Sequence, residues 1–273
     1  MAFSVALQIH SVKDYAERDL KGTLQKIKDM GYDGVEFAGL YGHTPTEVKD
    51  MVEEIGLVPI SAHVPLEEML ANPDKVMADY VEIGCSYIAI PDIGEERRPG
   101  TEGFEQTIKE IEMLGSLAQQ HGIQMLYHNH DHEFQKIKGE YGLDVLYQSV
   151  PSELLQTQID TCWVYVAGED PAEYVRKYTG RAPLVHLQDF VMGENQESDS
   201  QRSVLSDEAV PSEEEFLAFR PLGYGVQNFP AILTAAEEAG AEWVIVGQDR
   251  PSMGKTPMES ADMSRQYLKS LGI

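Results

Sequence analysis

The sequence predicts a single (β/α)8 barrel, and its length, its alternating segments and the places of its polar residues all favour that fold. The chain has 273 residues, close to the roughly 250 of a typical barrel. Buried-strand candidates alternate with amphipathic helical stretches along the whole chain. Polar side chains gather where the predicted strands end, the place where such barrels hold their active sites. We therefore expect one domain over 1–273.

Eight short apolar runs predict the strands, and helical periodicity fills the stretches between them, as at 20–30 and 104–120. Helix starts are marked at 44–47, 170–173 and 256–259 by a capping residue, a proline and a glutamate. A doubly wound sheet is the alternative, but no G-x-G-x-x-G turn follows the first strand. The predicted strands are 4–11, 34–40, 58–64, 87–92, 123–130, 155–161, 183–189 and 243–249.

Composition and charge disfavour several classes of function. Lys and Arg number 21 against 46 Asp and Glu, so the net charge is −25. Nucleic acid and anionic membrane surfaces both need a positive protein surface. No apolar run approaches the ~20 residues of a membrane span, and the N-terminal residues carry no signal-peptide pattern. Two cysteines make no disulfide framework, so the cytoplasm is the expected compartment.

The most informative segment is 127–134, YHNHDHEF, which follows a buried strand. It carries His128, His130 and His132 together with Asp131 and Glu133. The three histidines share one face if the strand alternation continues through them. Metal-competent side chains at this position predict catalytic or metal-binding chemistry.

Polar residues also end most of the other predicted strands. Carboxylates and imidazoles that converge from several strands predict a divalent metal, Mn²⁺ first, with Zn²⁺, Co²⁺ or Mg²⁺ as alternatives. A metal on a carbonyl and its neighbouring hydroxyl stabilises an enediolate, and flanking acid/base residues then move the proton. Taken singly, Asp160 has the alternative role of a helix cap, and Glu36 that of a partner for a nearby base. These strand-end residues are Gln8, His10, Glu36, His63, Asp92, Asp160, His186, Gln188, Asp189, Gln248 and Asp249.

A series of motifs runs in order along the chain: 34–37 GVEF, 61–63 SAH, 128–134 HNHDHEF, 158–163 QIDTCW, 185–189 VHLQD, 221–225 PLGYG and 247–251 GQDRP. In this order they resemble the xylose isomerase-like TIM-barrel superfamily of sugar phosphate isomerases and epimerases. The resemblance implies a metal held by Glu133, Asp160 and His186, with a glutamate of the eighth strand as fourth ligand.

The resemblance also implies roles for other residues of the site. Glu133 would be a catalytic residue as well as a ligand, and His63 and His130 complete the catalytic candidates. Gln248 is the neutral candidate for the fourth metal position. The expected substrate-binding residues are Gln8, Glu36, His128, Gln188, Gln248 and Arg250.

Three positions depart from the family pattern. The eighth strand reads V-G-Q-D where V-E-Q-D is usual, so Gly247 replaces the fourth ligand, and we expect Gly247→Glu to tighten metal binding. Gly223-Tyr224-Gly225 stands for Gly-Glu-Gly, and Gln188 stands for a lysine. Without the strand-eight carboxylate, the two bases of an epimerase are not both present, which favours a reaction that needs one base.

The leading hypothesis is a metal-dependent isomerase or epimerase that acts on a keto-sugar or polyol through an enediolate-type intermediate. One alternative is a keto-sugar or polyol lyase or dehydratase, including the C-glycoside-cleaving type. Another is a catalytically degenerate, sugar-binding barrel, and the charge disfavours a DNA-repair endonuclease of the same fold. We expect a small sugar or polyol as substrate, and a homo-oligomer or a small β-rich partner subunit. The long polar loop 191–221 is expected to be a lid, with partial disorder as the alternative.

Overall fold

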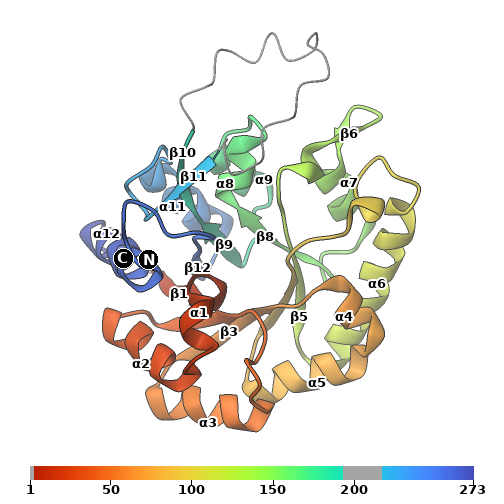
Figure 1. Cartoon of the computed structure of the whole chain (residues 1–273). Coiled ribbons are helices and arrows are strands. Elements are labelled where there is room, and N and C mark those ends of the chain that lie inside the picture. Colours follow the sequence, from red (N-terminus) through yellow and green to blue (C-terminus); the bar gives the residue numbers. More distant parts are fainter. Residues whose placement is uncertain (1–2, 193–216) are drawn as a thin grey trace, which may run out of the picture.

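Eight parallel strands close into a barrel in the computed structural model of the chain, which describes residues 3–192 and 217–273 (Figure 1). The order around the barrel is β1-β12-β9-β8-β5-β4-β3-β2. The last strand in sequence therefore pairs with the first, and the predicted barrel is confirmed. The strands are β1 (Ser4–Gln8), β2 (Gly34–Phe37), β3 (Val58–His63), β4 (Tyr87–Ile90), β5 (Gln124–His128), β8 (Gln156–Asp160), β9 (Leu184–Leu187) and β12 (Trp243–Val246).

All eight predicted strands are present, but each ends before its predicted last residue. β1 ends at Gln8 because the 3-10 helix η1 (Ile9–Val12) follows directly. β5 ends at His128, so His130 and His132 lie beyond the strand and its alternation. Side-chain periodicity does not reveal where hydrogen bonding to the neighbouring strand stops. Several polar residues predicted on strands consequently lie on the loops above the barrel.

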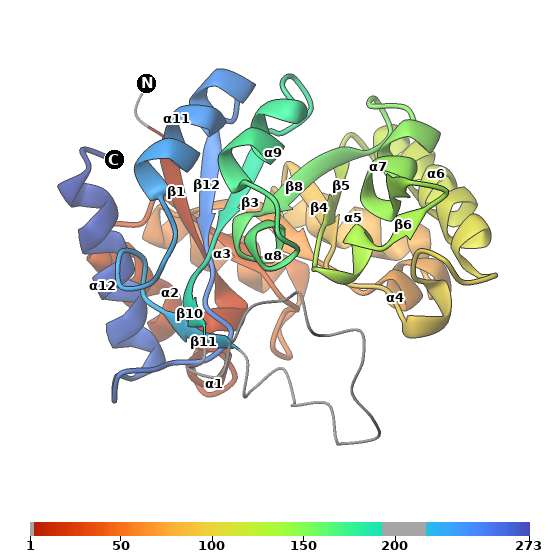
Figure 2. The same cartoon turned by 90° about the horizontal axis from the view of Figure 1, so that it is seen from above.

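Helices surround the barrel on its outside (Figure 2). Thr44 and Thr256 form the capping boxes that the sequence predicts, each with the glutamate three residues later. Short elements interrupt the loops on the site face, among them α1 (Lys13–Ala16), α4 (Leu66–Ala71), η2 (Glu95–Arg97), η3 (His132–Phe134) and α8 (Thr161–Val166). The outer helices are α2 (Leu20–Met30), α3 (Pro45–Ile55), α5 (Pro73–Ile83), α6 (Phe104–His121), α7 (Gly142–Ser149), α9 (Pro171–Lys177), α11 (Phe229–Ala239) and α12 (Pro257–Ser270).

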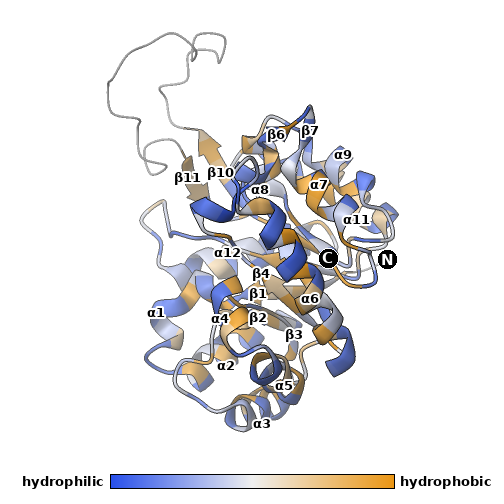
Figure 3. Ribbon diagram, turned by 90° about the vertical axis from the view of Figure 1, so that its right-hand side faces the viewer, coloured by the Kyte–Doolittle hydropathy of each residue, from blue (hydrophilic) through white to orange (hydrophobic). Residues whose placement is uncertain are grey.

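The apolar core has two parts. A large cluster lies between the strands and the helices, and the polar faces of the helices point away from it (Figure 3). A second, small cluster fills the inside of the barrel and closes it beneath the polar site. No helix of the described ranges is long and apolar enough to cross a membrane. The inner cluster consists of Ala6, Ile60, Ala89, Leu126, Leu184 and Ile245.

Two antiparallel hairpins were not predicted from the sequence. β6 (Lys136–Ile137) pairs with β7 (Glu140–Tyr141) beyond the histidine-rich segment. β10 (Asp189–Met192) pairs with β11 (Leu217–Arg220), so the two ends of the predicted loop 191–221 lie side by side. The predicted lid itself falls on 193–216, outside the described residues.

The inner cluster generates a prediction about stability. Leu126 is fully buried inside the barrel, so Leu126→Ala should leave a cavity and lower the free energy of unfolding by about 2–5 kcal/mol. Met113, on the outer face of α6, is 53% exposed. Met113→Ala should change the free energy of unfolding by less than about 0.5 kcal/mol. Denaturant unfolding of both variants measures the difference. Equal effects would show that the barrel interior does not carry the expected packing energy.

Candidate active site

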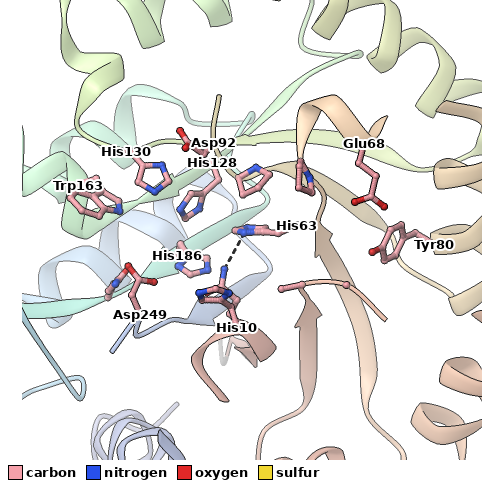
Figure 4. A pocket seen from close by; sticks show the side chains of 16 residues that line it. His10, His63, Glu68, Tyr80, Asp92, His128, His130, Trp163, His186 and Asp249 are labelled. Carbon is pink, nitrogen blue, oxygen red and sulfur yellow. Dashed lines mark hydrogen bonds between the residues drawn. The ribbon is translucent and has the colours of Figure 1, made fainter. Parts of the chain in front are cut away.

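A cavity of about 440 Å³ opens at the C-terminal end of the barrel (Figure 4). Each of the eight strands contributes to its wall, through its last residues or through the loop that follows. Among the described residues that line it there is no lysine or arginine, so this wall is built from neutral and acidic groups. The lining residues are Gln8, His10, Ala38, Gly39, His63, Pro65, Glu68, Tyr80, Pro91, Asp92, His128, His130, Trp163, His186, Gln188 and Asp249.

Three buried histidines form the centre of this cavity. Ring nitrogens of His63, His128 and His186 lie within 4.8 Å of one another, although they come from β3, β5 and β9. The His128 ring stands edge-on to both of the others, with centroid distances of 4.8 Å (Figure 4). Burial, and next the charges of His63 and His186, lower the pKa of His128 well below its usual value. His128 is thus neutral and keeps a lone pair for a ligand.

Asp160 uses its two carboxylate oxygens differently. Oδ1 accepts hydrogen bonds from the backbone N–H groups of Cys162 (2.8 Å) and Trp163 (3.2 Å), so it caps α8 as one interpretation of the sequence foresaw. Oδ2 is buried without a hydrogen-bond partner and lies 3.3 Å from His186 Nδ1 and 3.8 Å from His128 Nε2. One oxygen therefore fixes the helix while the other faces the histidines.

His186 lies between two buried carboxylates. Its Nδ1 faces Asp160, and its Nε2 lies 3.2 Å from Glu36 Oε1. Burial lowers the pKa of His186, but the two neighbouring carboxylates, Asp160 and Glu36, outweigh it and raise the pKa to about 10. Among the described residues, Nδ1 has no partner that satisfies hydrogen-bond geometry. Two such unsatisfied atoms, Asp160 Oδ2 and His186 Nδ1, are spaced like neighbouring ligands of one metal ion.

Glu133 occupies a different environment from the one that the family resemblance implies. Its carboxylate accepts hydrogen bonds from the Tyr127 hydroxyl (2.6 Å) and the His130 backbone N–H (2.8 Å), and it lies 2.7 Å from His132 Nε2. It is 1% exposed and is not among the residues that line the cavity. Its role as metal ligand and catalytic residue stays a prediction. His128, whose Nε2 lies 3.8 Å from Asp160 Oδ2, is the third candidate donor beside Asp160 and His186.

A second group of metal-competent side chains lies at the cavity rim. Asp92, His132 and Glu133 have ligand atoms within 4.8 Å of one another. His132 lies 3.3 Å from Asp92, whose side chain is half exposed, so this group is more open to solvent than the first. Glu133 is already engaged by Tyr127 and His130 here. We therefore regard the group around Asp160 and His186 as the stronger candidate.

The predicted catalytic histidines differ in what they contact. Both ring nitrogens of His63 are engaged, Nδ1 with Gln8 at 3.1 Å and Nε2 with Gln158 at 2.7 Å. His130 lines the cavity and packs on the Trp163 ring at 5.2 Å, and its buried Nδ1 has no hydrogen-bond partner among the described residues. Of these two histidines, His130 is therefore the one with an unengaged ring nitrogen.

The predicted substrate-binding residues divide into three groups by position. Gln8, His128 and Gln188 line the cavity, and Gln188 Nε2 is buried without a partner. Arg250 lines an adjoining cavity of about 340 Å³, whose wall also includes His130, Trp163 and Asp249. Glu36 and Gln248 are absent from both linings. Gln248 donates to the Arg250 carbonyl at 2.7 Å and leaves its own Oε1 unpartnered, so its role as fourth metal ligand also stays a prediction.

The space beside Gly247 is filled by another side chain. A Cβ atom added there would lie 2.5 Å from His186 Cε1 and 3.0 Å from His186 Nδ1. The His186 ring thus fills the space into which a side chain at this position would project. The expectation that Gly247→Glu tightens metal binding stays a prediction, and the His186 ring argues against it because the new side chain would have to displace that ring.

The other two departures from the family pattern have structural accounts. Asp189 accepts hydrogen bonds from the backbone N–H groups of Gly223 (2.9 Å) and Gly225 (2.8 Å), which fixes that turn. A Cβ at Gly225 would lie 2.2 Å from the Asp189 carboxylate, so only glycine fits. Tyr224, in place of the usual glutamate, is half exposed. Gln188 leaves a neutral amide where the family has a cation.

Sequence reasoning did not assign three of the polar or aromatic lining residues to the site. Trp163 lies on α8, three residues after Asp160, and presents an aromatic wall to both cavities. Glu68 and Tyr80 come from α4 and α5, away from any strand end, and lie apart from the histidines (Figure 4). The closeness of Trp163 to a strand-end aspartate was a usable signal, whereas nothing in the sequence marks Glu68 or Tyr80.

Comparison with known proteins agrees with this fold. The sequence matches the family described as xylose isomerase-like TIM barrel over residues 24–271. Inosose dehydratase 2 of Bacillus cereus is 24% identical over 281 residues, which cover 93% of this chain and 90% of that protein. An inosose dehydratase of Lacticaseibacillus casei is 26% identical over 274 residues, which cover 89% of this chain and 88% of that protein.

Solved structures are similar in fold. A sugar phosphate isomerase/epimerase from Parabacteroides distasonis ATCC 8503 has a TM-score of 0.77 and 20% identity over 99% of this chain and 95% of that one. The IOLI protein with a binding zinc atom has a TM-score of 0.72 and 15% identity over 98% and 97%. The chain belongs to the xylose isomerase-like TIM barrel family.

Proposed function

We propose that this protein is a metal-dependent lyase that removes water from a neutral keto-sugar or keto-polyol. The observation that carries the proposal is the His186 ring over Gly247, which leaves no carboxylate at that position beside the metal-ligand candidates. This replaces the isomerase or epimerase hypothesis as the first choice. Epimerisation through two bases needs one on each face of the substrate, whereas an elimination can use a single base for both proton steps.

Two further observations support this choice. The resemblance to an inosose dehydratase extends over nearly the whole chain, and dehydration of an inosose is the loss of water from a cyclic keto-polyol. The cavity suits an uncharged ligand, since its described lining contains no lysine or arginine. An epimerase remains the second candidate because the Parabacteroides structure has the same fold.

The donor atoms suit a divalent metal. Asp160 Oδ2, His186 Nδ1 and His128 Nε2 would hold it, with open positions left for substrate oxygens. Two imidazoles and one carboxylate suit Zn²⁺, Mn²⁺ or Co²⁺ better than Mg²⁺, which prefers oxygen ligands. The zinc atom of the IOLI protein accords with this choice. When bound, such a metal would polarise the substrate carbonyl and stabilise the charge that develops on its oxygen.

His130 is the residue we assign to proton transfer. Its ring lies in the wall shared by the two cavities and Nδ1 has no hydrogen-bond partner. In the proposed reaction His130 takes the proton from the carbon next to the carbonyl. The hydroxyl group on the following carbon then leaves with that proton as water, and a carbon–carbon double bond remains. Gln188 lines the cavity, and we assign its amide group to a substrate hydroxyl.

Other features of the expected biology stay predictions. No contact or site among the described residues tests the expected cytoplasmic location, or the expected homo-oligomer or small β-rich partner subunit. Release of a C-linked group from the substrate, instead of water, is a variant of the same one-base chemistry.

The proposed reaction makes a prediction about products. Incubation with a keto-inositol and a divalent metal should give a product lighter by one water, measured by mass spectrometry. His130→Gln should lower kcat by roughly 10²–10⁴-fold because it removes the proton carrier. His121 is the last residue of α6, and His121→Gln should leave kcat unchanged. A product of unchanged mass would instead establish an isomerase or epimerase.

A substitution at Asp160 can separate its proposed role as a metal ligand from its role as the cap of α8. Asp160→Asn keeps the oxygen that accepts from the Cys162 and Trp163 amides but loses the anionic Oδ2. Metal affinity should fall by more than the roughly 10–100-fold typical of residues that only support a ligand. Asp170→Asn, which caps α9, is the matched control and should bind metal normally. Full metal affinity in Asp160→Asn would refute the proposed ligand set.

Gly247 supplies a steric test. Gly247→Ala should weaken metal binding, because the added methyl group meets His186 Cε1 at 2.5 Å and must displace the ring. Chelator competition measures the change in affinity, and the unfolding midpoint with chelator present shows whether the fold is kept. Wild-type or tighter binding by Gly247→Ala would mean that the His186 ring does not lie over this position.

A further inference from the structure

Glu36 is a fully buried carboxylate surrounded by polar side chains from β1, β3, β8 and β9. Gln8 Nε2 lies 3.1 Å away, Ser61 Oγ 2.7 Å, and Gln158 Nε2 also donates to it. His63 Nε2 and His186 Nε2 lie 3.0 and 3.2 Å from Oε1. Glu36 thus accepts hydrogen bonds from three side-chain donors and also faces two imidazoles, a set of partners that suits a carboxylate.

These contacts fix the orientation of the His186 ring. Nε2 faces Glu36 and Nδ1 faces Asp160, so turning the ring over would point C–H groups at both carboxylates. A metal that displaced the Nδ1 proton would leave Nε2 protonated toward Glu36 and would use the Nδ1 lone pair beside Asp160 Oδ2. A carboxylate that accepts from the other nitrogen of a metal-bound histidine fixes the imidazole tautomer. It also makes the ring a better metal ligand.

Glu36 and position 247 meet different atoms of the His186 ring. A Cβ at Gly247 would touch the ring at Cε1 and Nδ1, whereas Glu36 approaches at Nε2. With glycine at 247, Asp160 is the one acidic candidate among the three donors, and Glu36 brings a second negative charge next to them. Because the surroundings are buried, that charge is screened little by solvent.

We propose that Glu36 is a positioning residue for the metal site, which holds His186 with Nδ1 toward Asp160 and supplies the charge that is lacking at Gly247. The inference rests on the metal-dependent function proposed above. It differs from the expected substrate-binding role, because Glu36 is 0% exposed and lines neither cavity. Its effect on the reaction passes through His186 and not through direct contact with substrate.

The test compares Glu36→Gln with Ser61→Ala in the full chain, with Mn²⁺ and Zn²⁺ affinities measured by chelator competition. Glu36→Gln keeps the size of the side chain but removes the charge, and the metal Kd should rise about 10–100-fold. Ser61→Ala removes one donor to the same carboxylate and keeps the charge, so its Kd should rise much less than that of Glu36→Gln. Glu36→Gln that folds and binds metal like wild type would overturn the inference.

A measurement on the unmodified protein keeps the inference testable if Glu36→Gln does not fold. Nitrogen NMR of protein loaded with an NMR-active cadmium isotope reports which His186 nitrogen carries the metal and which carries a proton. Cadmium coupling to Nδ1 with a protonated Nε2 is the expected result, and coupling to Nε2 would overturn the role of Glu36. If wild-type protein takes up no metal at all, the proposed function fails together with the inference. If the wild-type protein binds metal and Glu36→Gln binds it with the same Kd, the inference alone fails.

Discussion

The site depends on one interaction, the placement of the His186 ring between the buried carboxylates of Asp160 and Glu36. Each carboxylate faces a different ring nitrogen, at 3.3 and 3.2 Å. Buried carboxylates are costly unless they are paired, so both acids depend on the imidazole, and the imidazole is fixed by both acids. This mutual dependence gives the ring one orientation and leaves an unsatisfied oxygen and nitrogen side by side. That pair of atoms is the physical basis for the proposed metal site.

The closed barrel makes the interaction possible. Glu36, Asp160 and His186 come from β2, β8 and β9, and β8 and β9 are paired in a register that sets Asp160 opposite His186. The apolar cluster inside the barrel forms the floor on which this polar layer rests. The side chains of Gln8, Ser61 and Gln158 donate to the oxygens of Glu36, so hydrogen bonds within the protein stabilise its charge. Gly247 completes the layer by leaving room for the ring.

The sequence predicted the eight strands and the face that carries the site, because hydrophobic runs and strand-end polarity are local signals. It could not predict which polar residues touch. Glu133 and His128 lie five residues apart, and strand alternation no longer applies once the chain leaves β5 and enters η3. In the sequence, Gly247 looked like a missing ligand, because the ring that fills its space comes from another strand and that contact is visible only in the structure. Glu36 lies near the end of its strand like the substrate-facing residues, yet its side chain lies in a deeper layer, and only the packing of its neighbours reveals that.

Anomalous X-ray scattering from crystals grown with Mn²⁺ or Zn²⁺ would locate the metal directly and so test the central claim. The account predicts one strong peak at roughly 2.0–2.3 Å from both Asp160 Oδ2 and His186 Nδ1, with His186 Nε2 still beside Glu36. A peak among Asp92, His132 and Glu133 with none beside Asp160 would contradict it. So would metal bound to His186 through Nε2, because Glu36 could then not hold the ring as described.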